Sequence, residues 1–204
     1  AFRDGHSVED QTKAHQNCEV DVACPEIAGW ESQRDAVVQY FFVTGGNGYV
    51  CSGSMINNTN NDCTPYFLTA NHCGEPTTNA NITQHTYYFN YQRPNCTPGN
   101  TATYNGAQSE TMTGGTLKAS SALGNQPAAN GNQVDGSDFV LIQMATAVPA
   151  GYNAYFEGWD RAAAGATSGV GIHHPAGDEK KISTYSATLS STTYNGGWNG
   201  AHWL

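Results

Sequence analysis

The sequence is poor in charge. Charged residues make up 12% of the 204 positions, against about 25% in an average globular protein. The chain has 8 Lys and Arg against 17 Asp and Glu, a net charge of −9, and it lacks a basic stripe that could follow a phosphate backbone. It also lacks an uninterrupted apolar run of about 18 residues. We therefore expect neither nucleic acid nor a membrane among its partners.

A helical pattern is also missing, because apolar residues nowhere recur with a period of about 3.6 residues. Short β-type runs alternate instead with turn clusters rich in Gly, of which there are 23. This pattern predicts an all-β protein, a sandwich or barrel of antiparallel strands. Trp159 is expected in its core. The predicted strands are 35–43, 49–56, 66–70, 85–92, 114–122, 138–144, 155–159, 168–174 and 180–189.

The cysteines favour disulfides over zinc. Neither Cys-x-x-Cys nor His-Glu-x-x-His occurs, so the spacing does not suit a zinc site. An even number of cysteines in a Lys-poor chain predicts disulfides and an oxidising, extracellular compartment. The chain opens with Ala-Phe-Arg, so we expect that an export signal has been removed. The six cysteines are Cys18, Cys24, Cys51, Cys63, Cys73 and Cys96.

Residues 66–74, YFLTANHCG, carry the clearest chemical signal. A buried strand brings His72 to a turn, and a disulfide at Cys73 would fix the geometry that a general base needs. Further on, Asp138 begins an apolar strand, where its carboxylate can accept a hydrogen bond from Nδ1 of a histidine. The histidine Nε2 is then free to take a proton from a nucleophile. Asp135 and Asp160 are alternatives to Asp138.

Seven stretches, in order, resemble bacterial lysyl endopeptidases, which are secreted serine proteases of the chymotrypsin-like class. The resemblance implies two antiparallel β-barrels, with an N-terminal arm over 1–28, the first barrel over 29–150 and the start of the second, incomplete in this chain, over 151–204. The stretches are CEVDVACPE (18–26), CSGSMINNTNND (51–62), YFLTANHCG (66–74), YFNYQRPNC (88–96), SDFVLIQM (137–144), FEGWDR (156–161) and IHHPAGDEKKIS (172–183).

The resemblance also assigns roles to single residues. It makes His72 the general base and Asp138 the carboxylate that orients it. Tyr194 falls near the position where some members carry an aromatic residue beside the substrate cleft, and a plain packing role is the alternative. The resemblance implies no metal and no organic cofactor.

Two disulfides follow from the same resemblance, Cys51–Cys73 and Cys24–Cys96. Cys18 matches a cysteine whose partner lies further along the chain in the family. Cys63 has no counterpart there, so it either stays free or pairs with Cys18 in this protein.

The nucleophile of the family sits in a Gly-Ser-Ser-Gly-Ser-Pro-like segment, which does not occur in residues 1–204. The implied function is secreted serine endopeptidase activity on polypeptides, after Lys or another basic residue. A segment or second chain beyond residue 204, which Cys18 could hold by a disulfide, would supply the serine; a truncated product is the other explanation. The alternative function is that of a non-catalytic, protease-like scaffold that binds or inhibits.

Overall fold

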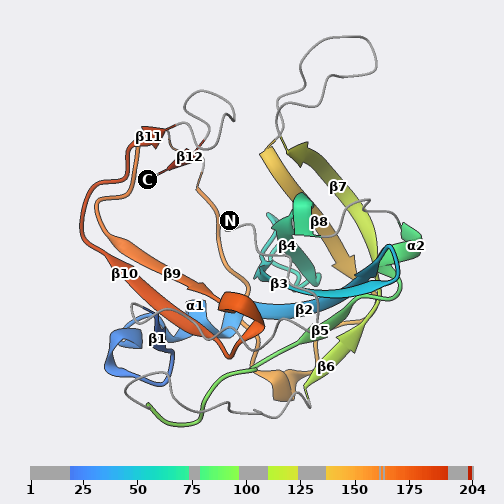
Figure 1. Cartoon of the computed structure of the whole chain (residues 1–204), viewed down its shortest axis with the longest axis horizontal. Coiled ribbons are helices and arrows are strands. Elements are labelled where there is room, and N and C mark those ends of the chain that lie inside the picture. The colour runs from blue at the N-terminus through green and yellow to red at the C-terminus, as the bar shows by residue number, and fades with distance from the viewer. Residues whose placement is uncertain are drawn as a thin grey trace.

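The computed structural model describes residues 19–73, 79–96, 110–123, 137–160, 162, 164–192 and 202–203, and this part of the chain is mostly β (Figure 1). Within it, no helix has the length and apolar character needed to cross a membrane. The strands are β1 (Val20–Asp21), β2 (Val37–Thr44), β3 (Asn47–Ile56), β4 (Tyr66–Ala70), β5 (Thr86–Tyr88), β6 (Thr111–Thr113), β7 (Gly115–Leu123), β8 (Ser137–Met144), β9 (Gly169–His173), β10 (Lys181–Tyr185), β11 (Ser191–Thr192) and β12 (His202–Trp203). The helices are α1 (Glu31–Ala36), α2 (Asn79–Ile82) and the 3-10 turns η2 (Pro25–Ile27), η3 (Asn71–Cys73), η4 (Ala150–Tyr152) and η5 (Pro175–Gly177).

Seven strands form one large sheet in the order β6-β5-β2-β3-β4-β8-β7. Its two edge strands, β6 and β7, are separated in sequence by Gly114 alone, so the sheet has to curl until its edges meet. Gly114 has a positive φ of 80° and donates its N–H to the His85 carbonyl at 2.8 Å. A Cβ there would lie 3.2 Å from the Thr83 carbonyl oxygen. Glycine therefore suits this junction both in conformation and in space.

The core fills the inside of this curled sheet. Side chains alternate between the two faces of a strand, and in β2 the inward positions Val38, Tyr40 and Phe42 are almost fully buried. Inward residues of the other strands, together with Ile82 from α2, complete one cluster. Its buried members are Val38, Tyr40, Phe42, Met55, Phe67, Ile82, Tyr87, Phe89, Met112, Val140, Ile142 and Met144.

A smaller antiparallel sheet, β1-β10-β9, lies beside the large one across β2 (Figure 1). Polar contacts join the two sheets. Gln39 Nε2 in β2 donates to the Gly177 carbonyl at 2.9 Å, and the backbone N–H of His174 donates to Ser52 Oγ at 2.8 Å. Strands β11 and β12 pair separately as a short ladder.

The sequence pattern located most strands, but it overestimated the length of one, was wrong about another and misplaced a core residue. The run 66–70 forms β4 as predicted, whereas 85–92 forms a strand only at Thr86–Tyr88. The run 155–159 forms no strand and makes one isolated bridge, between Glu157 and Ile56. The prediction of a core position for Trp159 is wrong, since 60% of it is exposed. Phe156 still packs against the core, but among the described residues no strand pairs with Gly158 or Trp159.

Candidate active site

His72 follows directly from a central strand of the large sheet. Strand β4 ends at Ala70, and its last residues lead into η3, which contains the His72 backbone. The side chain of His72 lies outside the described part of the structure. The next residue, Cys73, is disulfide-bonded to Cys51 in β3. The turn that carries His72 is thus tied covalently to the adjacent strand.

Asp138 lies at the same end of the sheet, near the start of β8. In the antiparallel ladder of β4 and β8, Ala70 pairs with Phe139 and Thr69 pairs with Val140. One further step of this register brings Asp138 opposite Asn71, the neighbour of His72. The Asp138 side chain is partly buried at this position. The predicted His72–Asp138 hydrogen bond stays a prediction, because it needs the His72 side chain.

The backbone of Asp138 is unusual, with a positive φ of 49°. Residues other than glycine rarely adopt this left-handed conformation, although aspartate tolerates it better than most. Such conformations persist where the surrounding structure fixes them and often occur at functional sites. Of the two alternatives, Asp135 lies outside the described residues. Asp160 is exposed and accepts the N–H of Ala162 at 2.8 Å, as a local turn residue does.

The structure contains two disulfides, Cys24–Cys96 and Cys51–Cys73, the two pairs that the resemblance implies. Disulfides are typical of proteins outside the reducing cytosol. Cys63 is free and exposed. Cys18 and Tyr194 lie outside the described residues, so the predicted roles of both stay predictions.

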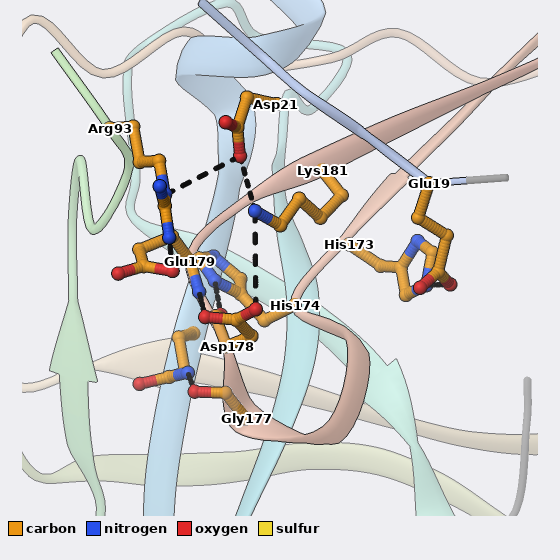
Figure 2. A network of polar contacts seen from close by, with 10 residues as sticks. Glu19, Asp21, Arg93, His173, His174, Gly177, Asp178, Glu179 and Lys181 are labelled. Atoms are coloured by element: carbon orange, nitrogen blue, oxygen red, sulfur yellow. Dashed lines mark hydrogen bonds and ion pairs between the residues drawn. The ribbon is translucent and has the colours of Figure 1, made fainter. Parts of the chain in front are cut away.

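A network of buried charges joins the small sheet to the rest of the protein (Figure 2). Lys181 Nζ donates to Asp21 Oδ1 and lies 3.9 Å from Asp178 Oδ2. Arg93 Nε lies 3.7 Å from Asp21 Oδ1 and 3.8 Å from Glu179 Oε2. Burying such charges is unfavourable unless they are paired, which explains why cations and carboxylates alternate in this cluster.

Glu179 is the least satisfied member of the network. It is fully buried, and within the described part of the chain neither carboxyl oxygen has a hydrogen-bond partner. Burial, followed by the neighbouring Asp178 carboxylate, raises the pKa of Glu179 to about 8. The adjacent Lys180 is also fully buried, and burial lowers its pKa to about 7, while its Nζ donates to the Arg34 carbonyl at 2.8 Å.

The two neighbouring histidines of this region have different surroundings. His173 Nε2 lies 3.1 Å from Glu19 Oε1 and is partly exposed. His174 is buried, stacks on the Tyr91 ring and has Nδ1 3.0 Å from the Asp178 carbonyl oxygen. A carbonyl can only accept, so Nδ1 carries the hydrogen. The described residues include no group of three or more side chains that could hold a metal ion.

Comparison with known families gives the family of the chain. The family model for the C-terminal domain of lysyl endopeptidase matches residues 12–204. The chain belongs to the lysyl endopeptidase family. This domain of the family therefore includes the β4 turn with His72 and the β8 start with Asp138.

One relative within the family is the lysyl endopeptidase of Pseudomonas aeruginosa, 30% identical over 203 residues. The match covers 96% of this chain but only 38% of that protein, so the chain spans less than two fifths of its relative. The crystal structure of the protease Anisep from Arthrobacter nicotinovorans is similar with a TM-score of 0.50 and 24% identity, over 79% of this chain and 67% of that one. At this identity the likeness shows the fold alone.

The sequence pattern does not single out two groups that the structure brings to this region. Thr69, three residues before His72, donates from Oγ1 to the Ser52 carbonyl at 2.8 Å, and a threonine in the run 66–70 is the only signal of this bond. The buried charge cluster has a clearer signal, since the run GDEKK at 177–181 gathers four charges in a chain with few.

Proposed function

We propose that this chain carries the general base His72 and the orienting carboxylate Asp138 of a secreted serine endopeptidase. The complete enzyme hydrolyses peptide bonds of polypeptides after Lys or another basic residue. A segment or chain beyond residue 204 supplies the nucleophilic serine, with Cys18 available for a disulfide to it. The fold of the complete enzyme is that of two antiparallel β-barrels of the chymotrypsin type, with the curled seven-stranded sheet as the first.

One observation carries this proposal above the others. The β4–β8 register, continued by one step, brings Asp138 opposite the residue that precedes His72. A carboxylate there can accept the Nδ1 hydrogen of His72, which leaves Nε2 to take the proton of a serine and return it to the leaving amine. The name of the Pseudomonas relative supports the preference for Lys. The disulfides support a secreted protein.

The test is an active-site label on the protein as it is secreted. We expect a fluorophosphonate to modify one serine that is not in residues 1–204, and we expect peptide substrates with Lys before the scissile bond to be cleaved fastest. Mass spectrometry with and without reductant shows whether that serine is on a disulfide-linked chain. A secreted protein without a labelled serine, or a His72→Ala variant that keeps full activity, would contradict the proposal and favour a non-catalytic scaffold.

A further inference from the structure

Two polar side chains, Gln39 and Ser52, connect the large sheet to the small one. The two residues are opposite each other in the β2–β3 ladder, so their side chains lie side by side on one face of the sheet. Val38 and Tyr40, the neighbours of Gln39, belong to the core, so Gln39 and Ser52 face outward. Gln39 is nevertheless only 1% exposed. Its Nε2 donates to the Gly177 carbonyl at 2.9 Å, which places the turn between β9 and β10 against this outer face.

The turn that these side chains hold is itself braced. Ser52 Oγ accepts the backbone N–H of His174 at 2.8 Å, where the turn begins. Nδ1 of the same histidine donates to the Asp178 carbonyl at 3.0 Å, and its ring stacks on Tyr91, which follows β5 of the large sheet. Figure 2 shows His174 and Asp178 on this turn. Because β9 enters the turn and β10 leaves it, the position of the turn sets the position of both strands.

Ser52 and its neighbour Cys51 also hold the His72 turn, one on each side. Thr69, three residues before His72, donates from Oγ1 to the Ser52 carbonyl at 2.8 Å. Cys73, directly after His72, is bonded to Cys51. The side chain of Ser52 thus contacts the small sheet, while its carbonyl and the preceding residue contact the segment around His72. Two consecutive residues of β3 therefore join the small sheet to the turn that carries the proposed general base.

We propose that Ser52 and Gln39 are positioning residues that align the small sheet with the His72 turn. The proposal rests on the proposed function, in which a segment beyond residue 204 carries the nucleophilic serine and completes the barrel that β9 and β10 begin. The position of that barrel against the large sheet then decides whether the serine hydroxyl lies within hydrogen-bond reach of His72 Nε2, which proton transfer requires. The proposal assigns neither positioning residue a contact with the substrate.

The first variant is Ser52→Ala in the complete enzyme. It removes the acceptor of the His174 N–H inside the protein, where losing a partner is costly. We expect kcat on a short Lys peptide to fall roughly 10-fold to 100-fold, with KM within about twofold, because small misplacements of reacting groups have effects of this size. The rate constant for labelling the serine with a fluorophosphonate should fall by a similar factor, because labelling needs the same serine and histidine but no peptide. Ser52→Thr keeps the hydroxyl and should retain most of kcat.

A second variant and two controls complete the set. Gln39→Met removes the donor to the Gly177 carbonyl, and we expect the same pattern, a lower kcat and slower labelling with little change in KM. Ser54→Ala changes the next serine on the same face of β3, and Gln143→Met changes a partly exposed glutamine of β8. Neither control residue takes part in the bonds to the turn, so both variants should keep the parent kcat and labelling rate.

Thermal unfolding of each variant accompanies the kinetics, and all rates are measured below the lowest midpoint. A lower midpoint with unchanged kcat and labelling rate would show that the two bonds only stabilise the fold, and it would overturn the proposal. A Ser52→Thr variant as slow as Ser52→Ala would also overturn it, since the hydroxyl would then not be the group that matters. A higher KM with an unchanged labelling rate would give the turn a role in substrate binding instead.

The wild-type protein separates failure of this inference from failure of the proposed function. If the wild type has neither a labelled serine nor peptidase activity, the proposed function fails and the positioning role fails with it. If the wild type is labelled and active, but Ser52→Ala and Gln39→Met behave like the two controls, the proposed function stands and only the positioning role is overturned.

Discussion

Cys73, the residue that follows His72, is bonded to Cys51 in the middle of β3, 22 residues earlier in the chain. The same turn is therefore held from two sides, by this covalent bond and by the pairing of β4 with β8. Single variants can test these contacts, the buried charges beside the small sheet, and the packing of β3 against β4. The stability measurements are best made in a His72→Ala background, so that cleavage of the protein by itself does not interfere.

Removing the disulfide beside the turn should affect both stability and catalysis. A Cys51→Ala, Cys73→Ala variant should lose about 3 kcal/mol in the free energy of unfolding, the typical effect for a loop of this length. The pair Cys24 and Cys96 closes a longer loop, with a separation of 72 residues, and its removal should destabilise at least as much. Urea unfolding measures the effect of each variant on stability, and the pH profile of kcat measures its effect on catalysis. We expect the profile to change only when Cys51–Cys73 is removed, and equal changes in both variants would argue against a role of that bond in aligning His72.

Replacing the proposed orienting carboxylate should abolish most of the turnover. Asp138→Asn keeps the size of the side chain but removes the charge that fixes the histidine tautomer, so kcat should fall by roughly four orders of magnitude. Asp160→Asn, in an exposed turn, is the matched control and should be silent. Steady-state kinetics with active-site titration of correctly folded enzyme gives the comparison. A drop of less than about tenfold in Asp138→Asn would move the role to another carboxylate, with Asp135 the next to test.

Buried Glu179 should make the protein less stable at alkaline pH. Burial and Asp178 raise the pKa of Glu179 from 4.5 to about 8, so the folded state binds this proton more tightly than the unfolded state. Its stabilising contribution is complete below about pH 4.5 and is lost as the pH rises through 8. Glu179→Gln removes this dependence. We expect the free energy of unfolding of the parent protein to fall by up to about 3 kcal/mol relative to Glu179→Gln between pH 5 and 9.

The pKa shift of the adjacent Lys180 makes stability depend on pH in the opposite direction. Its pKa is lowered from 10.5 to about 7, so its contribution is complete above about pH 10.5 and is lost as the pH falls through 7. A Lys180→Met variant separates this from the effect of Glu179. Glu26→Gln, at an exposed position, serves as the neutral control. If Glu179→Gln and its parent show parallel pH curves in urea unfolding, the raised pKa of Glu179 is wrong.

Gly53 in β3 should not tolerate a side chain. A Cβ there would lie 2.4 Å from Phe67 Cζ and 2.5 Å from the Leu68 carbonyl oxygen. The second contact is with backbone, so it cannot be relieved by a side-chain rotation, and Gly53→Ala should destabilise by roughly 1–3 kcal/mol. Gly171 in β9 has nothing within 4 Å of the same position. Gly171→Ala should therefore be neutral, and equal thermal midpoints for the two variants would contradict the close approach of β3 and β4.

Local patterns were enough to predict the strands with a clear alternation or a continuous apolar run. Residues 66–70 became β4, and the apolar run at 138–144 became β8 with Ser137 added. The sequence also singled out His72 and Asp138, because a polar residue at the end of an apolar strand stands out locally. Local pattern failed at 155–159, where aromatic residues form no strand and Trp159 is exposed. A strand needs a neighbour to pair with, and the sequence does not say which neighbours are present.

Which distant residues meet depends on the packing of the whole chain. The register of β4 with β8 spans about 70 residues of sequence, and it is this register that brings the start of β8 to the His72 turn. No local pattern connects Thr69 with Ser52, or buries Glu179 and Lys181 beside Asp21 and Arg93. Burying a charge or a hydroxyl is costly unless a partner satisfies it, so most of these groups depend on partners from other elements. Those partners are set by how the curled sheet and the small sheet pack together, which is a property of the whole fold.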